Sequence, residues 1–305
     1  MLYKQLNSWL YYALCFLNIP IGVVFFYIVL KKSPSTIRLY RNTLLNLGFW
    51  YYAASLEIGL LLQPVLDGLE TVQCTQICGL LAYFQDNLTL VSTAHVVGGA
   101  ACVNSAIALS LCFFVRYIQV AHPKIALYLN SKKGFMLATI PHLCGTICSS
   151  SFLSKFYFGN NYHRTESGLL FCADWKADLT FTIGFIVLIL GLVANSVSIV
   201  VLAFLTIRTL SKNRLQMSQK TYKLQKRLTL NLILLAVLPI VLDVVPLSSA
   251  LIIIYFQVSS MYFVSTIATH AQFLDVFLTC IITLIFVTPY RKAVLGWLPK
   301  RCQLF

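Results

Sequence analysis

The sequence predicts an all-α membrane protein, built as a bundle of seven transmembrane helices. Of its 305 residues, 59% are apolar and only 10% are charged, whereas a soluble domain carries about 25% charged residues. So little charge cannot cover the surface of a soluble protein of this length, which argues against soluble enzymes and disordered chains. Runs of about 20 apolar residues, which cross a bilayer as a helix, occur seven times.

The apolar runs are continuous, and this continuity favours helices over a membrane β-barrel. Every position from Phe185 to Ala194 is apolar, whereas a barrel would show alternating segments of about ten residues. The first run is too long for a signal peptide, and no small-residue cleavage site follows it before Lys31. The expected spans are residues 9–30, 42–63, 82–115, 134–153, 179–207, 228–256 and 263–288, within a single domain of residues 1–305.

Basic residues gather in alternate loops and predict the orientation of the chain. Nineteen of the 23 lysines and arginines follow spans one, three, five and seven, and all nine acids lie within the spans or on the opposite side. Because basic loops stay in the cytoplasm, we expect the N-terminus outside and the C-terminus in the cytoplasm. The net charge of +14 is then explained by membrane topology or by a docking surface for an acidic partner, and no nucleic acid is expected.

Ionisable residues inside a membrane are costly and therefore mark candidate functional positions. From the rise of a helix, Glu57, His95, Asp243 and His270 fall in the outer or middle parts of their spans. We expect these four side chains to line a ligand-binding cavity that opens outward. The alternative is that each is a structural polar group, paired inside the bundle.

Two further features predict a conformational switch. Span six contains Pro239 and Pro246, and a proline removes a backbone hydrogen bond and kinks a helix, which predicts either a hinge or static curvature. Asp275 lies nearer the middle of the membrane, where we expect an interhelical hydrogen-bond network with Asn104 and Asn195.

The cysteines indicate one disulfide and no metal site. Cys74, Cys78 and Cys172 face the oxidising side, so a bridge from Cys172 to either Cys74 or Cys78 is expected, and the sequence does not choose between them. No zinc-ligand spacing, phosphate-binding loop or catalytic motif occurs. The sequence therefore predicts a protein that is not an enzyme and holds no metal or cofactor.

The seven spans, the Arg116-Tyr117 pair that ends span three and the proline-kinked span six resemble a G-protein-coupled receptor. The closer resemblance is to the nematode serpentine chemoreceptors of the Str superfamily, with class H nearest. Val115 stands where many rhodopsin-type receptors have an acid beside the arginine, and Ala271 stands where class H has a glycine. The motifs that carry the resemblance are Lys32-Ser33-Pro34, Thr221–Lys226 leading into Leu238-Pro239, Pro246, His270 and Pro289-Tyr290-Arg291.

The resemblance implies a multi-pass receptor in the plasma membrane of a sensory neuron cilium. Such a receptor binds a small, odorant-like ligand from outside and activates a heterotrimeric G protein inside. The alternatives are a seven-span transporter, which often shows internal repeats and broken helices, and a ligand-gated channel subunit with its N-terminus inside.

A short interfacial helix is expected after span seven, around Val294 and Trp297. The resemblance assigns G-protein coupling to Arg116, Tyr117, Arg208, Lys223, Lys226, Arg227, Tyr290 and Arg291.

Overall fold

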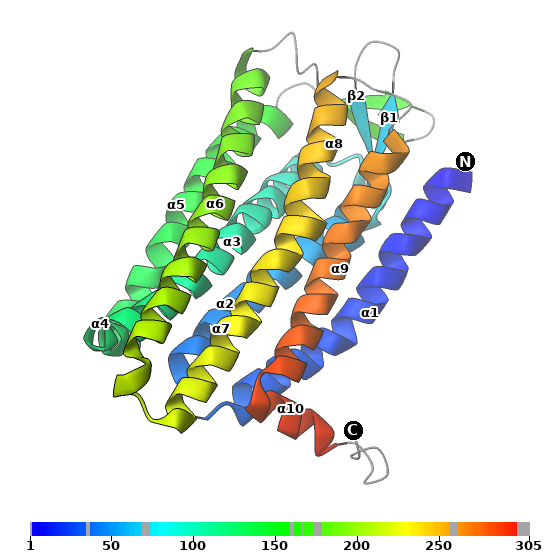
Figure 1. The fold of residues 1–305 in the computed structure, drawn as a ribbon. Coiled ribbons are helices and arrows are strands. Elements are labelled where there is room, and N and C mark those ends of the chain that lie inside the picture. Colours follow the sequence, from blue (N-terminus) through cyan, green and yellow to red (C-terminus); the bar gives the residue numbers. More distant parts are fainter. Residues whose placement is uncertain are drawn as a thin grey trace.

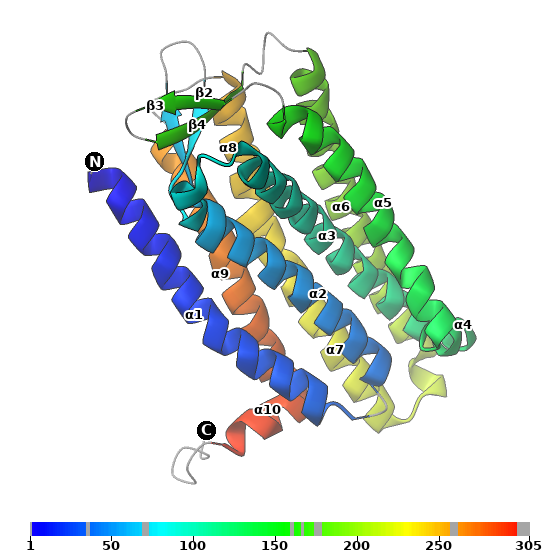
Figure 2. The same ribbon diagram turned by 180° about the vertical axis from the view of Figure 1, so that it is seen from behind.

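Long, roughly aligned helices dominate the computed structural model, with a small β-sheet at one end (Figures 1 and 2). The structure describes residues 2–34, 37–68, 73–158, 162–165, 168–173, 179–256 and 262–297. Seven helices in these ranges are long and apolar enough to cross a membrane. The expected seven-helix membrane bundle is therefore confirmed.

The first three spans run in sequence through one half of the bundle. They are α1 (Leu2–Lys32), α2 (Arg38–Leu56) with its π-helical continuation η2 (Glu57–Leu62), and α3 (Leu88–Ala121). The third span begins later than expected, because Leu80–Phe84 form a separate 3-10 turn, η3. The Asn87 side chain accepts a hydrogen bond of 3.0 Å from the Leu90 amide, and asparagine is a preferred residue at a helix start.

The remaining spans are α5, α6, the segment α7–η5–α8 and α9. Serine caps begin two of them: Ser131 accepts from the Gly134 amide at 3.3 Å, and Ser218 accepts from the Thr221 amide at 3.2 Å. Short elements connect them at one end of the bundle. The bounds are α4 (Pro123–Leu129), α5 (Lys132–Tyr157), α6 (Leu179–Lys212), η4 (Asn213–Gln216), α7 (Gln219–Pro239), η5 (Ile240–Val244), α8 (Val245–Phe256), α9 (Tyr262–Phe286) and α10 (Thr288–Leu295).

Span six changes its helical form between its two prolines. Pro239 is the last residue of α7, Ile240–Val244 form the π-helical turn η5, and Pro246 lies in the first turn of α8. Proline is tolerated at a helix start because the amide hydrogen that it lacks is not needed there. A π-turn inserts an extra residue and changes the direction of the side chains within it. The two prolines therefore frame a local irregularity in the helix.

A four-stranded antiparallel sheet covers one end of the bundle, an addition to the helices that the sequence did not predict. Its strands are β1 (Pro64–Gly68), β2 (Gln73–Ile77), β3 (Tyr162–Thr165) and β4 (Gly168–Ala173), in the order β1-β2-β4-β3. The pairing of β2 with β4 places Cys74 opposite Cys172, and these two residues form the disulfide. The strands are only four to six residues long, and the pairing of β2 with β4 joins segments far apart in the chain, so no strong local pattern predicts the sheet.

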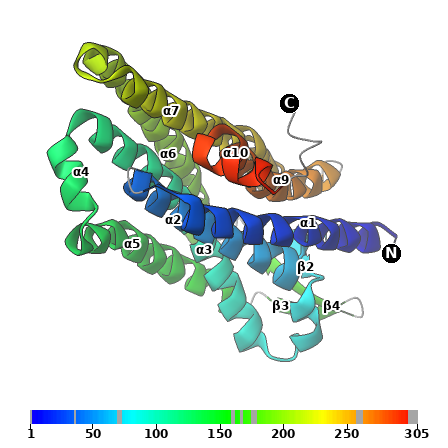
Figure 3. The same ribbon diagram turned by 90° about the horizontal axis from the view of Figure 1, so that it is seen from below.

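One end of the bundle carries the β-sheet and the other carries the basic connecting segments, and we call them the sheet end and the basic end. The sheet end carries β1–β4 and the start of α1 (Figure 1). The basic end carries α4, α10 and the connection between α6 and α7. Figure 3 looks onto the basic end, where α10 packs against α9 and α1. The helix expected after span seven is therefore present as α10.

The apolar core lies between α1, α2, α3, α7 and α9, and α3 packs against α2, α5 and α6. Many large apolar side chains on the outside of the bundle are exposed, such as Val187, Leu190 and Phe204 on α6. An apolar exterior fits a bundle whose solvent is lipid. Buried core members include Phe25, Ile28, Tyr40, Leu44, Leu47, Leu109, Phe113, Leu232, Leu235 and Tyr290.

We predict that Cys172→Ser destabilises the protein by about 2–5 kcal/mol, because the bridge closes a loop across 98 residues of sequence. The thermal unfolding midpoint of the purified protein measures the change. Cys78→Ser is the matched control, since Cys78 lies four residues from Cys74 but outside the bridge. Equal midpoints for the two variants would contradict the prediction.

Candidate functional site

A small cavity lies inside the bundle between α2, α3, η5 and α9, and we call it the acidic cavity. Its volume is about 60 Å³. Two aspartates contribute to its wall, Asp243 from the π-turn of span six and Asp275 from α9. The full lining consists of Tyr51, Ala54, Ser55, Ile58, Ser105, Asp243, Gln272, Phe273, Asp275 and Val276.

Asp275 is the most deeply buried acid in the described part of the chain, with 1% of its surface exposed. Asp243, Tyr51 and Thr279 all lie close enough to interact with its carboxyl group. Neither carboxyl oxygen of Asp275 nevertheless has a well-formed hydrogen bond among the described residues, and one oxygen of Asp243 is in the same situation. Buried polar groups are normally hydrogen-bonded. The acidic cavity is therefore a place where the protein alone leaves polar groups unsatisfied.

Of the four expected ligand-binding residues, only Asp243 lines this cavity. Glu57 lies nearby at the start of η2, where its side chain packs so closely on Gly98 that a β-carbon there would lie 2.6 Å from the Glu57 Cγ. Cys102 of α3 lies close to both Glu57 and Asp243. One oxygen of Glu57 is buried without a hydrogen-bond partner in the described residues.

The two histidines pack against tyrosines toward the sheet end. His95 stacks on Tyr157 at 4.4 Å, and its Nδ1 lies 3.0 Å from the Val91 carbonyl oxygen. Tyr162 of β3 covers it with a hydroxyl 3.5 Å from the ring nitrogen, and burial raises the pKa of Tyr162 to about 12. His270 lies against Tyr11 of α1 at 4.3 Å. The four residues thus do not surround one common cavity.

The expected network of Asp275 with Asn104 and Asn195 is not formed. Asn104 instead bonds to the Nδ1 of His142 at 2.8 Å and donates to Thr146 at 2.8 Å, both on α5. The reason is helical geometry: consecutive residues on a helix point about 100° apart, so Ser105 reaches the acidic cavity while Asn104 faces away. Asn195 on α6 accepts a hydrogen bond from Ser110 of α3.

Arg116 at the basic end is buried, with 2% of its surface exposed. It donates to the Gln225 carbonyl oxygen at 2.5 Å and to the Thr229 hydroxyl at 3.2 and 3.3 Å, both on α7. It also donates to the side chain of Gln119 at 3.3 Å. Each of these acceptors is uncharged, which agrees with the absence of an acid at Val115. Arg116 therefore joins α3 to α7 through hydrogen bonds, and we call this contact the α3–α7 tether.

Tyr290 connects two of the sequence motifs at the basic end. Ser33 of the Lys32–Pro34 motif donates to the Val29 carbonyl oxygen at 2.6 Å, and its hydroxyl lies 2.7 Å from that of Tyr290. Tyr290 is fully buried, and burial raises the pKa of its phenol. Two motifs that are 257 residues apart in the sequence thus meet where α1 ends and α10 begins.

The other expected coupling residues form an exposed basic surface around the tether. Tyr117 is partly exposed and packs edge-on against His122 at 6.2 Å. Arg227 on α7 donates to the Thr288 hydroxyl of α10 at 2.8 Å. The charged members, all exposed at the basic end, are Arg208, Lys223, Lys226, Arg227 and Arg291.

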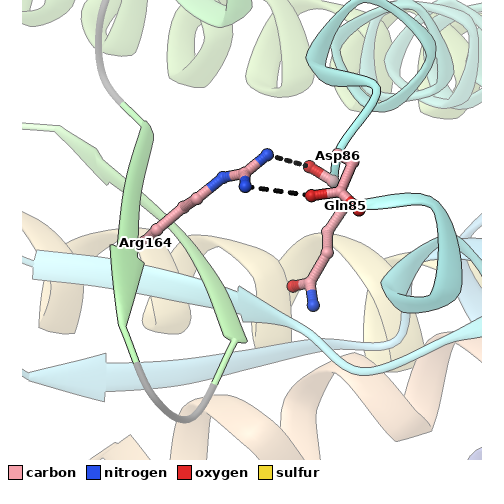
Figure 4. A network of polar contacts seen from close by, with 3 residues as sticks. All are labelled: Gln85, Asp86 and Arg164. Carbon is pink, nitrogen blue, oxygen red and sulfur yellow. Dashed lines mark hydrogen bonds and ion pairs between the residues drawn. The ribbon is translucent and has the colours of Figure 1, made fainter.

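An ion pair at the sheet end joins strand β3 to the turn before α3. Arg164 lies 2.9 Å from the Asp86 carboxylate and donates to the backbone carbonyl of Gln85 at 3.3 Å (Figure 4). The two charged side chains are 60% and 90% exposed. Water screens such a pair, so its contribution to stability is small.

Comparisons with known proteins agree with this architecture. The serpentine-type seven-transmembrane G-protein-coupled chemoreceptor family Srh matches residues 4–300. Among solved structures, the crystal structure of squid rhodopsin matches with a TM-score of 0.70 and 14% sequence identity, covering 99% of this chain and 88% of that one. No curated protein matches the sequence. The identity to squid rhodopsin is low, so this likeness concerns the fold.

We predict that Ser33 and Tyr290 stabilise the protein jointly, by about 0.5–1.5 kcal/mol in a double-mutant cycle of Ser33→Ala and Tyr290→Phe. The free energy of unfolding of the four proteins in the cycle provides the measurement. Tyr128→Phe, on the exposed surface of α4, replaces Tyr290→Phe in the control cycle. Additive effects of the Ser33 and Tyr290 changes would show that their contact contributes nothing.

Proposed function

Because the chain belongs to the Srh family of serpentine seven-transmembrane G-protein-coupled chemoreceptors, we propose how this receptor is oriented and how it signals. The sheet end faces outward and admits a small, odorant-like ligand. The basic end faces the cytoplasm and binds a heterotrimeric G protein. The receptor acts in the plasma membrane of a chemosensory neuron, at the sensory cilium.

The observation that carries this proposal is that span six contributes both to the α3–α7 tether at the basic end and to the acidic cavity inside the bundle. Its residues Gln225 and Thr229 accept the hydrogen bonds of Arg116, and Asp243 lines the acidic cavity. Thr229 and Asp243 are 14 residues apart, which is about 21 Å along a helix. A change near Asp243 therefore reaches the tether along one helical segment, whose form changes from the π-turn η5 to α7 at Pro239.

We infer that a ligand bound on the sheet side of the acidic cavity changes the angle of span six at Pro239 or Pro246. The basic end of α7 then moves away from α3, and Arg116 loses its acceptors and becomes accessible to the G protein. A ligand achieves this only by binding the open state more tightly than the closed state. A shift from about 1% to 99% active requires roughly 5.5 kcal/mol of such a difference.

The four residues that were expected to contact the ligand have different roles in this proposal. Asp243 lies at the base of the ligand path, while Glu57 and His270 lie nearer its entrance. His95 supports the sheet through Tyr157 and Tyr162. The exposed basic residues around the tether attract the acidic surface of the partner protein, and this attraction weakens as salt screens it.

We predict opposite effects for the two sides of the α3–α7 tether. Thr229→Val removes an acceptor but keeps Arg116, so basal G-protein activation rises about fivefold, as expected for about 1 kcal/mol of lost restraint. Arg116→Ala removes the group that the G protein contacts, so activation falls to background. A nucleotide-exchange assay on cells with matched surface expression measures both.

Two side chains outside the tether provide the controls for this pair. Thr209→Val on α6 makes the same chemical change as Thr229→Val, and Lys124→Ala on α4 removes an exposed cationic side chain; both leave activation unchanged. Normal ligand-dependent activation by Arg116→Ala would contradict its coupling role. Lowered basal activity in Thr229→Val would contradict the restraint.

The orientation is tested separately with epitope tags at the two termini. We expect an N-terminal tag to bind antibody on intact cells, and a C-terminal tag to bind only after permeabilisation. The reason is that the basic connections stay on the cytoplasmic side. A C-terminal tag that is labelled on intact cells would reverse the proposed topology.

A further inference from the structure

We propose that a groove beside the part of α1 nearest the sheet (Figure 2), which we call the α1 groove, binds small neutral molecules that carry one hydrogen-bonding oxygen, such as ketones. This inference rests on the proposed function, because it names where an odorant-like ligand binds and what chemistry that ligand has. The groove has a volume of about 430 Å³. The described residues that line it are Gln5, Ser8, Trp9, Tyr12 and Cys78.

One wall of the groove is a single face of α1. Four of the lining residues stand at positions 5, 8, 9 and 12, and residues three or four apart lie on the same side of a helix. Tyr11 points to a different side, because consecutive residues diverge by about 100°. Its hydroxyl donates to Thr269 of α9 at 3.0 Å, and its ring packs on His270 at 4.3 Å. One side of α1 thus holds the helix against α9, while another side is left to the groove.

The segment that contributes Cys78 is fixed to the end of span two. The Cys78 amide donates to the carbonyl oxygens of Leu62 at 3.2 Å and Gln63 at 3.4 Å, and the amide of the next residue donates to Leu62 at 3.0 Å. A β-carbon at Gly79 would lie 2.3 Å from the Leu61 carbonyl oxygen, so the two segments are in close contact. A wall held in this way needs little ordering when a ligand binds, which favours affinity.

The lining combines aromatic surface with neutral polar groups, and this combination selects the class of ligand. Trp9 and Tyr12 supply the rings, and 71% of Trp9 is exposed. Gln5 and Ser8 add an amide and a hydroxyl, and the indole and the phenol each carry a hydrogen-bond donor. The described lining residues include no charged side chain, and an ion loses hydration without a compensating charge in such a site. The lining therefore suits a neutral molecule with an apolar body and an oxygen that accepts a hydrogen bond.

The size of the groove fits such a ligand, whereas the acidic cavity is too small for it. Ligand pockets measure about 300–1,000 Å³, and the two volumes are about 430 and 60 Å³. The groove and the cavity are also close in the contact network. Tyr11, the chain neighbour of Tyr12, packs edge-on against Phe273 at 5.2 Å, and Phe273 lines the acidic cavity. A ligand in the groove thus binds beside the contact that joins α1 to the wall of the cavity.

The test measures how fast N-ethylmaleimide alkylates Cys78 in the purified full-length receptor, reconstituted in phospholipid nanodiscs. Cys78 lies outside the disulfide and is partly exposed, and mass spectrometry of its peptide separates it from the other cysteines. Three probes of similar size are compared: acetophenone has a carbonyl oxygen, ethylbenzene lacks it, and benzoate is charged.

We expect saturating acetophenone to slow the alkylation by about threefold or more, with half-maximal protection at about 0.1–1 mM. Ethylbenzene needs about a fivefold higher concentration, because it lacks the hydrogen bond. Benzoate leaves the rate unchanged, because the lining offers no compensating charge.

Trp9→Ala removes the larger ring of the lining, so we expect half-maximal protection to need at least about a fivefold higher acetophenone concentration. Phe16→Ala is the matched control, since Phe16 is an aromatic residue of the same helix with 78% of its surface exposed and is not among the lining residues. It keeps the protection of the wild type. Both side chains are exposed, so we expect both variants to fold.

Quenching of tryptophan fluorescence provides a second measurement, which decides the question even where Cys78 reacts slowly. A bromine atom quenches an indole that it contacts, and para-bromoacetophenone carries its bromine on the ring, where it does not alkylate thiols. We expect this probe to quench the wild-type receptor with saturation, and Trp9→Phe to abolish the saturable part.

Tryptophan and tyrosine also gather at membrane interfaces without binding a ligand, and several outcomes would reveal that case and overturn the proposal. Equal protection by acetophenone and ethylbenzene that Trp9→Ala leaves unchanged would indicate partition into the bilayer. An alkylation rate that depends on the phospholipid but not on acetophenone would assign the groove to lipid. Protection by benzoate, or quenching that is the same in Trp9→Phe, would contradict it as well. Neither readout involves a G protein, so this proposal can fail while the predictions for the α3–α7 tether hold, and the reverse.

Discussion

Inside a bilayer, a polar group must find its partner within the protein, and the structure of this receptor depends on that constraint. Its helices form hydrogen bonds within their own backbones, and most of their buried polar side chains also form hydrogen bonds inside the protein. Asn104, His142 and Thr146 bond to one another between α3 and α5, and Arg116 finds acceptors on α7. Asp275 in the acidic cavity is among the buried side chains for which no such partner is found in the described residues. Unsatisfied groups are expensive in such an environment, so their presence indicates a functional position.

Span six takes part in the polar contacts of both the acidic cavity and the α3–α7 tether. Its π-turn presents Asp243 to α9, and its basic end accepts the hydrogen bonds of Arg116 on α3. The prolines that frame the π-turn keep this region from forming a regular helix. Coupling between distant sites needs an element with two arrangements that both sites influence. Span six is placed to be that element, since it is continuous from the cavity to the tether.

The tether differs from a restraint built on an ion pair. Within the part of the chain that the structure describes, the acceptors of Arg116 are uncharged, and the residue beside it, Val115, provides no carboxylate. Hydrogen bonds to a charged donor are stronger than neutral ones, but they lack the full attraction of a buried ion pair. A restraint of this kind is released at lower cost. In the proposed mechanism, a contact of moderate strength therefore holds the basic end closed.

The sheet end is held together by aromatic contacts and a disulfide, whereas the basic end is held by the hydrogen bonds of Arg116. The bridge between Cys74 and Cys172 joins β2 to β4, and Tyr162 and Phe171 cover His95 beneath them. These contacts fasten the sheet to the ends of α3 and α5. The sheet end is thus covered by structure of its own, while the basic end presents charged side chains to its surroundings.

The sequence by itself determined the seven spans, their approximate limits and the asymmetry of charge, because each depends on local composition. It also identified Arg116, Tyr290 and the two prolines of span six as special positions, since such residues are unusual where they occur. The pairing of Cys172 with Cys74, the four-stranded sheet and the meeting of Ser33 with Tyr290 required the tertiary structure. Each joins segments far apart in the chain, and no local pattern encodes such a contact.

The site illustrates the same division. Composition marked Asp243 and Asp275 as costly residues, but the choice of partners depended on the directions in which helices point. Ser105 rather than Asn104 reaches the cavity because adjacent residues on a helix diverge, and the π-turn sets the direction of Asp243. Glu57, His95 and His270 share the apparent depth of the cavity but face other neighbours. Depth can be counted along a sequence, whereas direction is decided only when the helices pack.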